Sequence, residues 1–535
     1  MRRTRGVMAV VACLLLLTLA PIATAKPGNG VDRAPQVDLQ ILAFNDFHGQ
    51  LGPYYPNVGG AAYLATYLRD LEATTRNTVI VSGGDLIGAS PLTSALFHDE
   101  PTIEAANLMG VDVAVVGNHE FDEGWEELLR MQSGGCHPVD GCLDGDGFDG
   151  ADFPFLAANV VREDTGRTLF PPYKVMTFNG VRVAFIGVVL EGTPSIVTAS
   201  ATEGLEFLDE ADTINAWVQY LKKRRIETFV AIVHQGGSSS CTGAIADIVD
   251  QTNDEVDLFI TGHTHNTYVC DIDGRTVTGT RNGGRVFTEI HLTLNKVTKE
   301  VVSVTAVNHD VWTADVTPAA DVTALVAEYE ALAAPLANQV IGSVTADITT
   351  TANAAGESAL GDVIADAQLA ATSAVVAFMN PGGIRTHILY GEISGSELPG
   401  EVTYGEAFKV QPFANYLTTM TLTGAQIDAL LEQQFVAGRM LQVSDGFTYT
   451  WSSSAPVGSK VDPASIMIGG VPIDLGADYR VTMNSFLADG GDGFTVFTQG
   501  TDRITGIVDV DALADYLGAS SPVAPGPQDR ITMAP

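Results

Sequence analysis

The stretch Gly117-Asn118-His119-Glu120-Phe121-Asp122 decides how this chain is understood, both its fold and its chemistry. It follows an apolar run, 111–116, that predicts a buried β-strand. Gly117 allows the backbone to turn sharply and another group to approach closely. An amide, an imidazole and two carboxylates follow, and such side chains are ligands for divalent metals of intermediate softness. By itself the stretch is equally compatible with a loop that holds one hydrogen-bonded histidine.

The same arrangement recurs after four other predicted strands. Each apolar run is followed by a glycine-containing loop that carries Asp or His, and the runs are 37–44, 78–81, 229–233 and 257–261. The loops present Asp46, His48, Asp85, His234, His263 and His265. Ligands of layered α/β folds bind beyond the carboxyl ends of strands. Buried polar groups that shared no ligand would each need a separate partner. We therefore predict one shared metal centre, with His98 outside it at the surface.

Length and composition restrict the class of protein. The chain has 535 residues, enough for two or more domains with full cores. It is 46% hydrophobic and 17% charged, which is typical of a globular protein. The formal net charge of −36 argues against binding to nucleic-acid polymers or anionic membranes. An anionic substrate therefore needs local positive charge, such as bound metal ions.

Residues 1–25 have the pattern of a secretory signal peptide. Arginines 2, 3 and 5 precede an apolar run at 7–19, and Ala23-Thr24-Ala25 forms a cleavage site. An uncleaved anchor is the alternative, but the run is short for a membrane span and no second run approaches about 18 residues. We expect a secreted, extracellular protein with no membrane anchor after cleavage.

Four cysteines remain after the signal peptide: Cys136, Cys142, Cys241 and Cys270. No Cys-x-x-Cys occurs, which argues against a thiolate zinc site. Four cysteines in an exported chain suggest two disulfides with three possible connectivities. We favour Cys136–Cys142 and Cys241–Cys270 because each pair lies in one local region, and free buried thiols are the alternative.

The sequence pattern divides the chain further. A first domain at 36–315 is followed by a linker at 316–341, whose helix at 322–332 we expect Pro335 to end or kink. A second domain at 342–519 has predicted helices at 359–370 and 422–431 and strands at 375–379 and 479–483. We expect the proline- and glycine-rich tail, 520–535, to be loosely held.

Loops of the second domain carry candidate substrate contacts. Phe413 and Phe486 are suited to clamp a planar ring by offset stacking, although core packing is the alternative. Arg385 follows two glycines and suits an anionic oxygen, with a surface salt bridge as the alternative.

The loops 45–49, 83–85, 117–120 and 262–265, in this order, resemble those of calcineurin-type metallophosphoesterases. The second half is similar to the C-terminal domain of secreted 5′-nucleotidases, through the loops 380–385, 411–415 and 490–494. The resemblance implies an α/β fold, with a four-layer αββα metallophosphoesterase domain followed by a smaller α/β substrate-binding domain. It also implies an exported hydrolase that releases phosphate from nucleoside 5′-monophosphates.

The resemblance further implies residue roles. One divalent metal ion would be held by Asp46, His48, Asp85 and His265, and a second by Asp85, Asn118, His234 and His263. His119 would be catalytic and oriented by Asp122, while Glu120 has no assigned role. The substrate site would comprise Asn380, Arg385, Phe413, Asn415, Phe486 and Asp492. The ligands fit Zn, Mn, Co or Fe without choosing among them.

One departure and two alternatives qualify this interpretation. Relatives often carry an arginine shortly before the helix near Gly361, but 349–357 contains none, so we expect Arg385 to provide most of the phosphate grip. The same site would also suit a 2′,3′-cyclic nucleotide phosphodiesterase or a UDP-sugar hydrolase. A non-catalytic nucleotide-binding surface protein is a further alternative, against which the complete ligand set with His119 and Asp122 argues.

Overall fold

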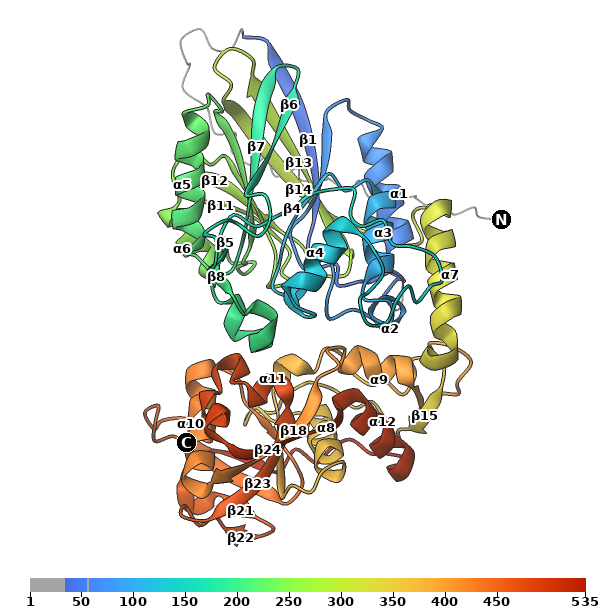
Figure 1. Ribbon diagram of the computed structural model, residues 1–535, viewed down its shortest axis with the longest axis vertical. Coiled ribbons are helices and arrows are strands. Elements are labelled where there is room, and N and C mark those ends of the chain that lie inside the picture. The colour runs from blue at the N-terminus through green and yellow to red at the C-terminus, as the bar shows by residue number, and fades with distance from the viewer. Residues whose placement is uncertain (1–33, 55–56) are drawn as a thin grey trace, which may run out of the picture.

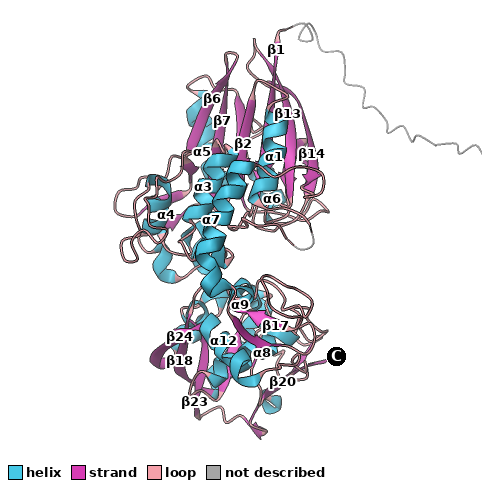
Figure 2. Ribbon diagram, turned by 90° about the vertical axis from the view of Figure 1, so that its right-hand side faces the viewer, coloured by secondary structure: helices cyan, strands magenta, loops and turns pink. Residues whose placement is uncertain are grey.

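The computed structural model describes residues 34–54 and 57–535 and shows two domains joined by the helix α7 (Ala320–Ala337) (Figure 1). The predicted signal peptide, 1–25, lies outside the described residues. Figure 2 shows α7 running along the first domain and reaching the second. Within the described ranges, none of the helices combines the length and apolar character needed to cross a membrane.

Two six-stranded sheets form the centre of the first domain. The order of the first sheet is β14 (Val301–Asp310), β13 (Val286–Asn295), β1 (Gln36–Phe44), β2 (Thr78–Ser82), β3 (Val113–Val115) and β4 (Phe155–Leu156). The order of the second is β11 (Tyr268–Ile272), β12 (Arg275–Gly279), β10 (Leu258–Thr261), β9 (Thr228–His234), β7 (Val181–Val189) and β6 (Tyr173–Phe178). A small ribbon of β5 (Val160–Arg162) and β8 (Leu205–Phe207) lies beside them.

Alternating apolar side chains bury both faces of each sheet. Side chains such as Ile41 and Val81 meet Phe185 and Ile232 in a core between the two sheets. The outer face of the first sheet packs on α1 (Ala61–Glu72), α3 (Glu100–Met109) and α4 (Trp125–Ser133). The outer face of the second packs on α5 (Glu210–Lys222) and α6 (Ala244–Gln251). These layers confirm the predicted αββα arrangement.

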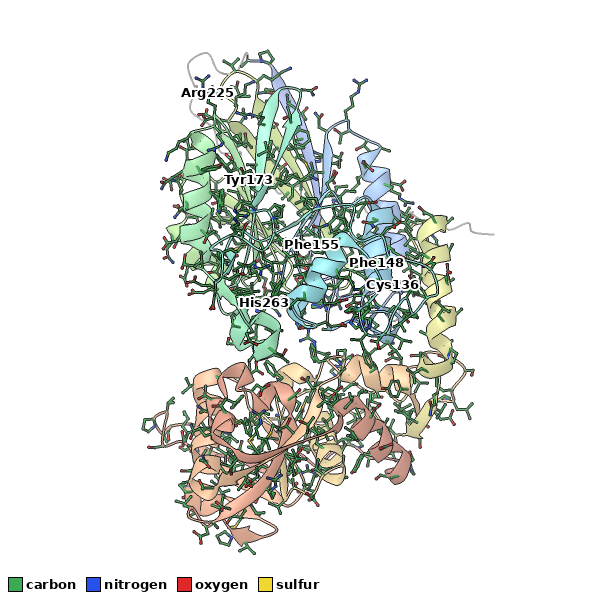
Figure 3. All side chains as sticks on the ribbon, in the orientation of Figure 1. Cys136, Phe148, Phe155, Tyr173, Arg225 and His263 are labelled. Atoms are coloured by element: carbon green, nitrogen blue, oxygen red, sulfur yellow. A yellow bond between two sulfur atoms is a disulfide. The ribbon has the colours of Figure 1, made fainter. Side chains whose placement is uncertain are left out.

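The strands that precede the predicted ligand loops run parallel within each sheet. β1 pairs with β2, and β2 with β3, in parallel register, while β9 pairs with β10 in the same way in the second sheet. Their carboxyl ends therefore meet at one edge of the domain. This edge faces the second domain, as the position of His263 in Figure 3 shows.

The second domain is smaller and also α/β. Its main sheet has the order β19 (Gln442–Val443), β16 (Val376–Met379), β23 (Asp478–Asn484), β18 (Tyr416–Thr423) and β24 (Thr501–Val508). A second sheet contains β22 (Val471–Pro472), β21 (Met467–Ile468), β20 (Phe447–Ser452) and β25 (Ile531–Ala534), and β15 (Val340–Ser343) pairs with β17 (Glu401–Thr403). The helices are α8 (Ala359–Ala370), α9 (Tyr404–Val410), α10 (Gly424–Ala437), α11 (Ser485–Ala488) and α12 (Asp509–Ser520).

Of the two outcomes expected for the linker helix at Pro335, an end or a kink, the first is excluded: the helix continues to Ala337, because a proline so near the end of a helix removes only one of its last hydrogen bonds. The helix predicted at 422–431 is α10, which begins two residues later and continues to Ala437. The prediction for the tail was wrong. The tail is not loosely held, since β25 pairs in parallel with β20. The buried Arg530 fixes it further by a two-pronged ion pair with Asp366, with nitrogen–oxygen distances of 2.8 Å.

Candidate active site

Three side chains from two loops form the first cluster at the strand ends. The ring nitrogens Nε2 of His48 and His265 face each other at 3.2 Å. His265 Nε2 also lies 3.3 Å from Oδ1 of the fully buried Asp46. Two nitrogens and one carboxylate oxygen at such separations can share one cation, which is the arrangement expected of a metal site.

Asp85 connects this cluster to a second one. Its Oδ2 lies 3.8 Å from His48 Nε2 and 3.1 Å from His234 Nε2. His263, which belongs to the same group as Asp85 and His234, has its Nδ1 2.9 Å from Asn118 Oδ1. The structure thus brings all seven predicted ligands to one edge, with Asp85 between the two clusters.

The electrostatics of the clusters fit a bound cation. Burial lowers the pKa of His48 to about 3 and that of His263 to about 4, so both imidazoles are neutral at pH 7 and can act as ligands. His234 Nε2 is buried and makes no well-directed hydrogen bond within the part of the chain that the structure describes. Burial by itself lowers the pKa of His234, but the Asp85 carboxylate outweighs it and raises the pKa to about 10. The buried carboxylates therefore demand positive charge at this place.

The backbone is strained at most of these ligands. Left-handed φ values occur at Asp46 (51°), His48 (50°), Asp85 (50°), His263 (70°) and His265 (54°). Such values are uncommon for residues other than glycine and cluster at functional sites, where the surrounding structure enforces them.

Glu120, which had no role by sequence reasoning, holds the ligand loops in place. Its buried carboxylate accepts hydrogen bonds from the backbone N–H groups of Asp85 at 3.0 Å, Leu86 at 2.7 Å and Gly117. One side chain therefore fastens the loop after β2 to the loop after β3. The sequence signal was present, since a carboxylate in a buried loop needs donors, but nothing in the sequence identified them.

His119 lies beside the clusters and is paired with Asp122. Its Nδ1 lies 2.9 Å from Asp122 Oδ2. Burial lowers the pKa of His119, but the carboxylates of Asp122 and Asp85 outweigh this effect and raise it above the usual value. The arrangement leaves Nε2 of His119 available for a substrate.

A pocket between the domains begins at His119 and extends into the second domain. From the first domain it is lined by Asn118, His119, Asp122, His263 and the segment 196–198. From the second it is lined by Asn380, Gly382, Gly383, Arg385, Phe413, Asn415, Arg439, Asn484, Phe486 and Asp492. All six predicted substrate residues therefore lie in one cavity with the predicted catalytic pair.

The two predicted clamp residues differ in their surroundings. The Phe413 ring stacks on His119, with ring centroids 5.6 Å apart and planes 16° apart, and the Arg385 guanidinium lies 5.6 Å from its centre. The Phe486 ring lies over Gly491, where a Cβ atom would come within 2.5 Å of the ring. Glycine at 491 thus makes room for the ring.

Arg439 is a pocket residue that sequence reasoning missed. Its Nη1 lies 3.0 Å from Asp492 Oδ1. Asn380 donates to Asp492 Oδ2 at 2.8 Å and accepts from Asn484 Nδ2 at 3.0 Å. Arg439 follows α10, whose sequence carries no sign that it reaches the 380–385 loop. The second domain therefore contributes two guanidinium groups to the pocket, those of Arg385 and Arg439.

Both favoured disulfides are present. Cys241–Cys270 joins the segment after β9 to β11, and so links the loop of His234 to that of His263 and His265. Cys136–Cys142 closes a short loop after α4.

Two stacked sheets with a histidine, aspartate and asparagine edge define a calcineurin-like phosphoesterase domain, and the family model of that name matches residues 39–267. The family model of the 5′-nucleotidase C-terminal domain matches residues 340–499. The chain therefore belongs to the 5′-nucleotidase family of calcineurin-like phosphoesterases, a family of metal-dependent phosphoester hydrolases. The resemblance found in the loops is confirmed.

Individual proteins are similar to this chain over most of its length. The chain is 32% identical to the cell wall protein Lmo0130 of Listeria monocytogenes, over 96% of this chain and 71% of that protein. It is 33% identical to the endonuclease YhcR of Bacillus subtilis over 94% of this chain, but spans only 41% of that longer protein. The crystal structure of a 5′-nucleotidase precursor from Thermus thermophilus superposes with a TM-score of 0.77 at 26% identity, covering 93% of this chain and 99% of that one.

Proposed function

We propose that this chain is an exported phosphohydrolase that uses two divalent metal ions to release phosphate from nucleoside 5′-monophosphates. One observation carries the proposal: a single pocket joins the metal-ligand edge and His119 to two phenylalanines and two arginines of the second domain. The name of the Thermus thermophilus protein supports the substrate class.

The ligands divide into two sets that share Asp85. Asp46, His48 and His265 would hold one ion with Asp85, and Asn118, His234 and His263 would hold the other. When bound, such a pair of ions supplies an activated water nucleophile and neutralises phosphoryl oxygens.

The chain's own residues would then handle the leaving group and the phosphate. His119, held through Nδ1 by Asp122, would give a proton from Nε2 to the departing ribose oxygen. Arg385 lies near Phe413 and His119, where its guanidinium would contact the phosphate. The rest of the nucleotide would extend away from His119 into the second domain.

The far part of the pocket suits a nucleoside. Phe413 and Phe486 would sandwich the base, and stacking on an aromatic side chain contributes about 1–3 kcal/mol per base. The network of Asn380, Asp492 and Arg439 offers hydrogen-bond donors and an acceptor to the base or ribose.

A hydrolysis panel tests the proposal, with products separated by chromatography because cyclic nucleotides, UDP-glucose and DNA can be cleaved without release of inorganic phosphate. The substrates are the four 5′-monophosphates, 2′,3′-cyclic AMP, UDP-glucose and single-stranded DNA, each assayed with and without a chelator. We expect the highest kcat/KM for a 5′-monophosphate and no turnover after complete metal removal. A higher kcat/KM for a cyclic nucleotide, UDP-glucose or DNA would contradict the substrate class, and turnover without metal would contradict the metal site.

Aromatic variants test the clamp, with AMP from the same panel and with p-nitrophenyl phosphate, which carries no nucleoside. Phe413→Ala and Phe486→Ala should each lower kcat/KM for AMP by about 5- to 100-fold, the equivalent of ~1–3 kcal/mol, with a smaller loss for p-nitrophenyl phosphate. Phe435→Ala is the matched control, because Phe435 packs on Trp451 in the same domain and does not line the pocket. Equal losses for both substrates would refute the clamp.

Export is tested separately. The proposal predicts that the protein recovered from the culture medium begins at Lys26, which N-terminal sequencing would show. Recovery only of chains that retain residues 1–25 would contradict export by cleavage.

A further inference from the structure

A second group of histidines and carboxylates lies outside the active site, around the loop closed by Cys136–Cys142. His137 and Asp140 belong to this loop. His98, which was expected at the surface, is half-buried and follows α2 (Leu92–Ala95). Glu123 directly follows Asp122. Three separate segments thus converge on one point.

The side chains of this group lie within hydrogen-bonding distance of one another. His98 Nε2 lies 3.0 Å and His137 Nδ1 3.2 Å from the same oxygen, Asp140 Oδ2. The other ring nitrogen of His98, Nδ1, lies 2.7 Å from Glu123 Oε2. Ligand atoms of His98, Glu123 and His137 all lie within 4.8 Å of one another.

We propose that this group binds a third divalent transition-metal ion, of the class of Zn²⁺, through His98 Nε2, His137 and Asp140. Two imidazoles and a carboxylate with one open position are a common zinc ligand set, and ligand atoms about 2.0–2.2 Å from zinc lie roughly 3.3–3.5 Å apart, close to the two nitrogen–oxygen separations that His98 and His137 make with Asp140 Oδ2. Glu123 would accept the Nδ1 proton of His98 and so fix the tautomer that presents Nε2 to the ion.

The geometry requires one movement. The rings of His98 and His137 stack, with centroids 3.8 Å apart and planes 17° apart, so their in-plane lone pairs do not yet converge. Binding therefore requires rotation of the His137 ring about its Cβ–Cγ bond, and His137 lies in a short loop whose following residues, 138–140, are exposed.

A bound ion would reinforce segments that position the active site. Asp99, next to His98, accepts a hydrogen bond from the Gly88 N–H at 2.9 Å, and the Gly88 carbonyl oxygen lies 2.9 Å from His48 Nδ1. Asp122 accepts from the Ala89 N–H at 3.1 Å. The ion would therefore tie the disulfide loop to the two segments that hold His48 and His119.

The competing interpretation is an ion pair without metal. Partial burial lowers the pKa of His98, but hydrogen bonds and charge from Glu123 and Asp140 outweigh burial and raise it to about 9. In that case the protonated imidazole of His98 bridges the carboxylates of Glu123 and Asp140, and no third metal ion is bound.

Metal counting on the full-length protein distinguishes these interpretations. The protein is loaded with Zn²⁺, dialysed exhaustively against metal-free buffer and analysed by mass spectrometry of the metal. We expect wild type to retain one equivalent more than His98→Ala and one more than His137→Ala. Because the readout is a difference in metal content, it does not depend on whether nucleotides are substrates.

Two further variants sharpen the experiment. Glu123→Ala should retain the third equivalent but bind it about 10- to 100-fold more weakly in a Zn²⁺ titration, because it removes the partner that orients His98. His387→Ala is the matched control, since His387 is an exposed histidine whose Nδ1 accepts a hydrogen bond from the backbone N–H of Thr350 at 3.1 Å, and it should match wild type. Equal zinc content in wild type, His98→Ala and His137→Ala, with circular dichroism showing folded protein, would overturn the proposal.

Discussion

At the scale of single residues, neighbours decide what each polar group does. His119 and His263 are both partly buried imidazoles near the same carboxylates, yet the pKa of His119 is raised and that of His263 is lowered to about 4. Burial lowers both, but Asp122 hydrogen-bonds His119 directly, whereas His263 faces the amide of Asn118. One imidazole is therefore suited to carry a proton and the other to bind metal.

This difference predicts a pH effect for Asp122→Asn. Loss of the carboxylate lowers the pKa of His119, so the protonated form, which is the proposed general acid, is lost at lower pH. The alkaline limb of the kcat–pH profile should move down by about 1 pH unit or more. His119→Ala should lower kcat by about 10²–10⁴-fold. Profiles of wild type and Asp122→Asn with superimposable alkaline limbs would show that Asp122 does not act through His119.

Arg439 leads to a prediction about substrate binding. Arg439→Ala should raise KM for AMP by about 10- to 100-fold with little change in kcat, because Arg439 lines the pocket beside Asp492, away from the proposed reacting centre, and a charge-assisted hydrogen bond from its guanidinium to the nucleotide would contribute about 1.5–3 kcal/mol. Steady-state kinetics measure both constants. Arg439→Lys keeps the positive charge but loses the planar guanidinium group. Its KM for AMP should therefore lie between those of wild type and Arg439→Ala. A fall in kcat at unchanged KM would contradict this role.

At the scale of elements, the active site is made by loops that follow parallel strands and are fastened to one another. β1, β2 and β3 belong to one sheet and β9 and β10 to the other, so no single sheet supplies the ligands. Glu120 fastens two loops of the first sheet, and Cys241–Cys270 fastens two loops of the second.

Removal of the Glu120 carboxylate should loosen the first pair of loops. Glu120→Ala leaves at least three buried backbone N–H groups without acceptors, each costing about 1–3 kcal/mol. We expect the free energy of unfolding to fall by about 3 kcal/mol or more and metal to be lost faster to a chelator. Urea denaturation and metal analysis measure the two effects, and a variant as stable as wild type would refute this account.

Removal of the Cys241–Cys270 bond should loosen the second pair. The two cysteines are 29 residues apart, and closing such a loop contributes about 3–4 kcal/mol in the chain-entropy model. Cys241→Ser with Cys270→Ser should therefore lose phosphatase activity faster in EDTA. Cys136→Ser with Cys142→Ser is the comparison, because that bond spans 6 residues and closes a loop that supplies no ligand to the two proposed active-site ions. Equal rates in both double variants would contradict the prediction.

At the scale of the whole molecule, the pocket exists only because the two domains face each other. Residues 118–122 and 196–198 of the first domain and Phe413 of the second line the same cavity, and Phe413 stacks directly on His119. A nucleotide that is enclosed from both sides needs the domains to separate before it can enter or leave. α7 is the covalent connection about which they would move (Figure 2).

Domain separation is measurable by single-molecule fluorescence transfer. Labels at two exposed positions, Leu208 in the first domain and Val436 on α10, should report two populations without nucleotide and one with a non-hydrolysable analogue. Labels at Val302 and Tyr220, both exposed in the first domain, are the control and should report one population throughout. A single unchanged population for the interdomain pair would contradict the motion.

Much of the secondary structure was predictable from the sequence, because the signals for helices and strands are local. The boundaries of α8 were predicted to the residue, and the strands before the ligand loops to within about two, since apolar periodicity over a short window specifies each element. The tail was mispredicted because a neighbouring element decided its conformation: β20 pairs with β25.

The sequence by itself determined the α/β architecture, the ligand loops and the family, because strand periodicity, glycine turns and ligand-type side chains are properties of short segments. Only the tertiary structure decided which loops meet, what Glu120 holds, that Arg439 joins the pocket, and that His98 lies with His137 and Asp140. Each of these depends on contacts between residues far apart in the chain, and side-chain type alone does not determine such contacts.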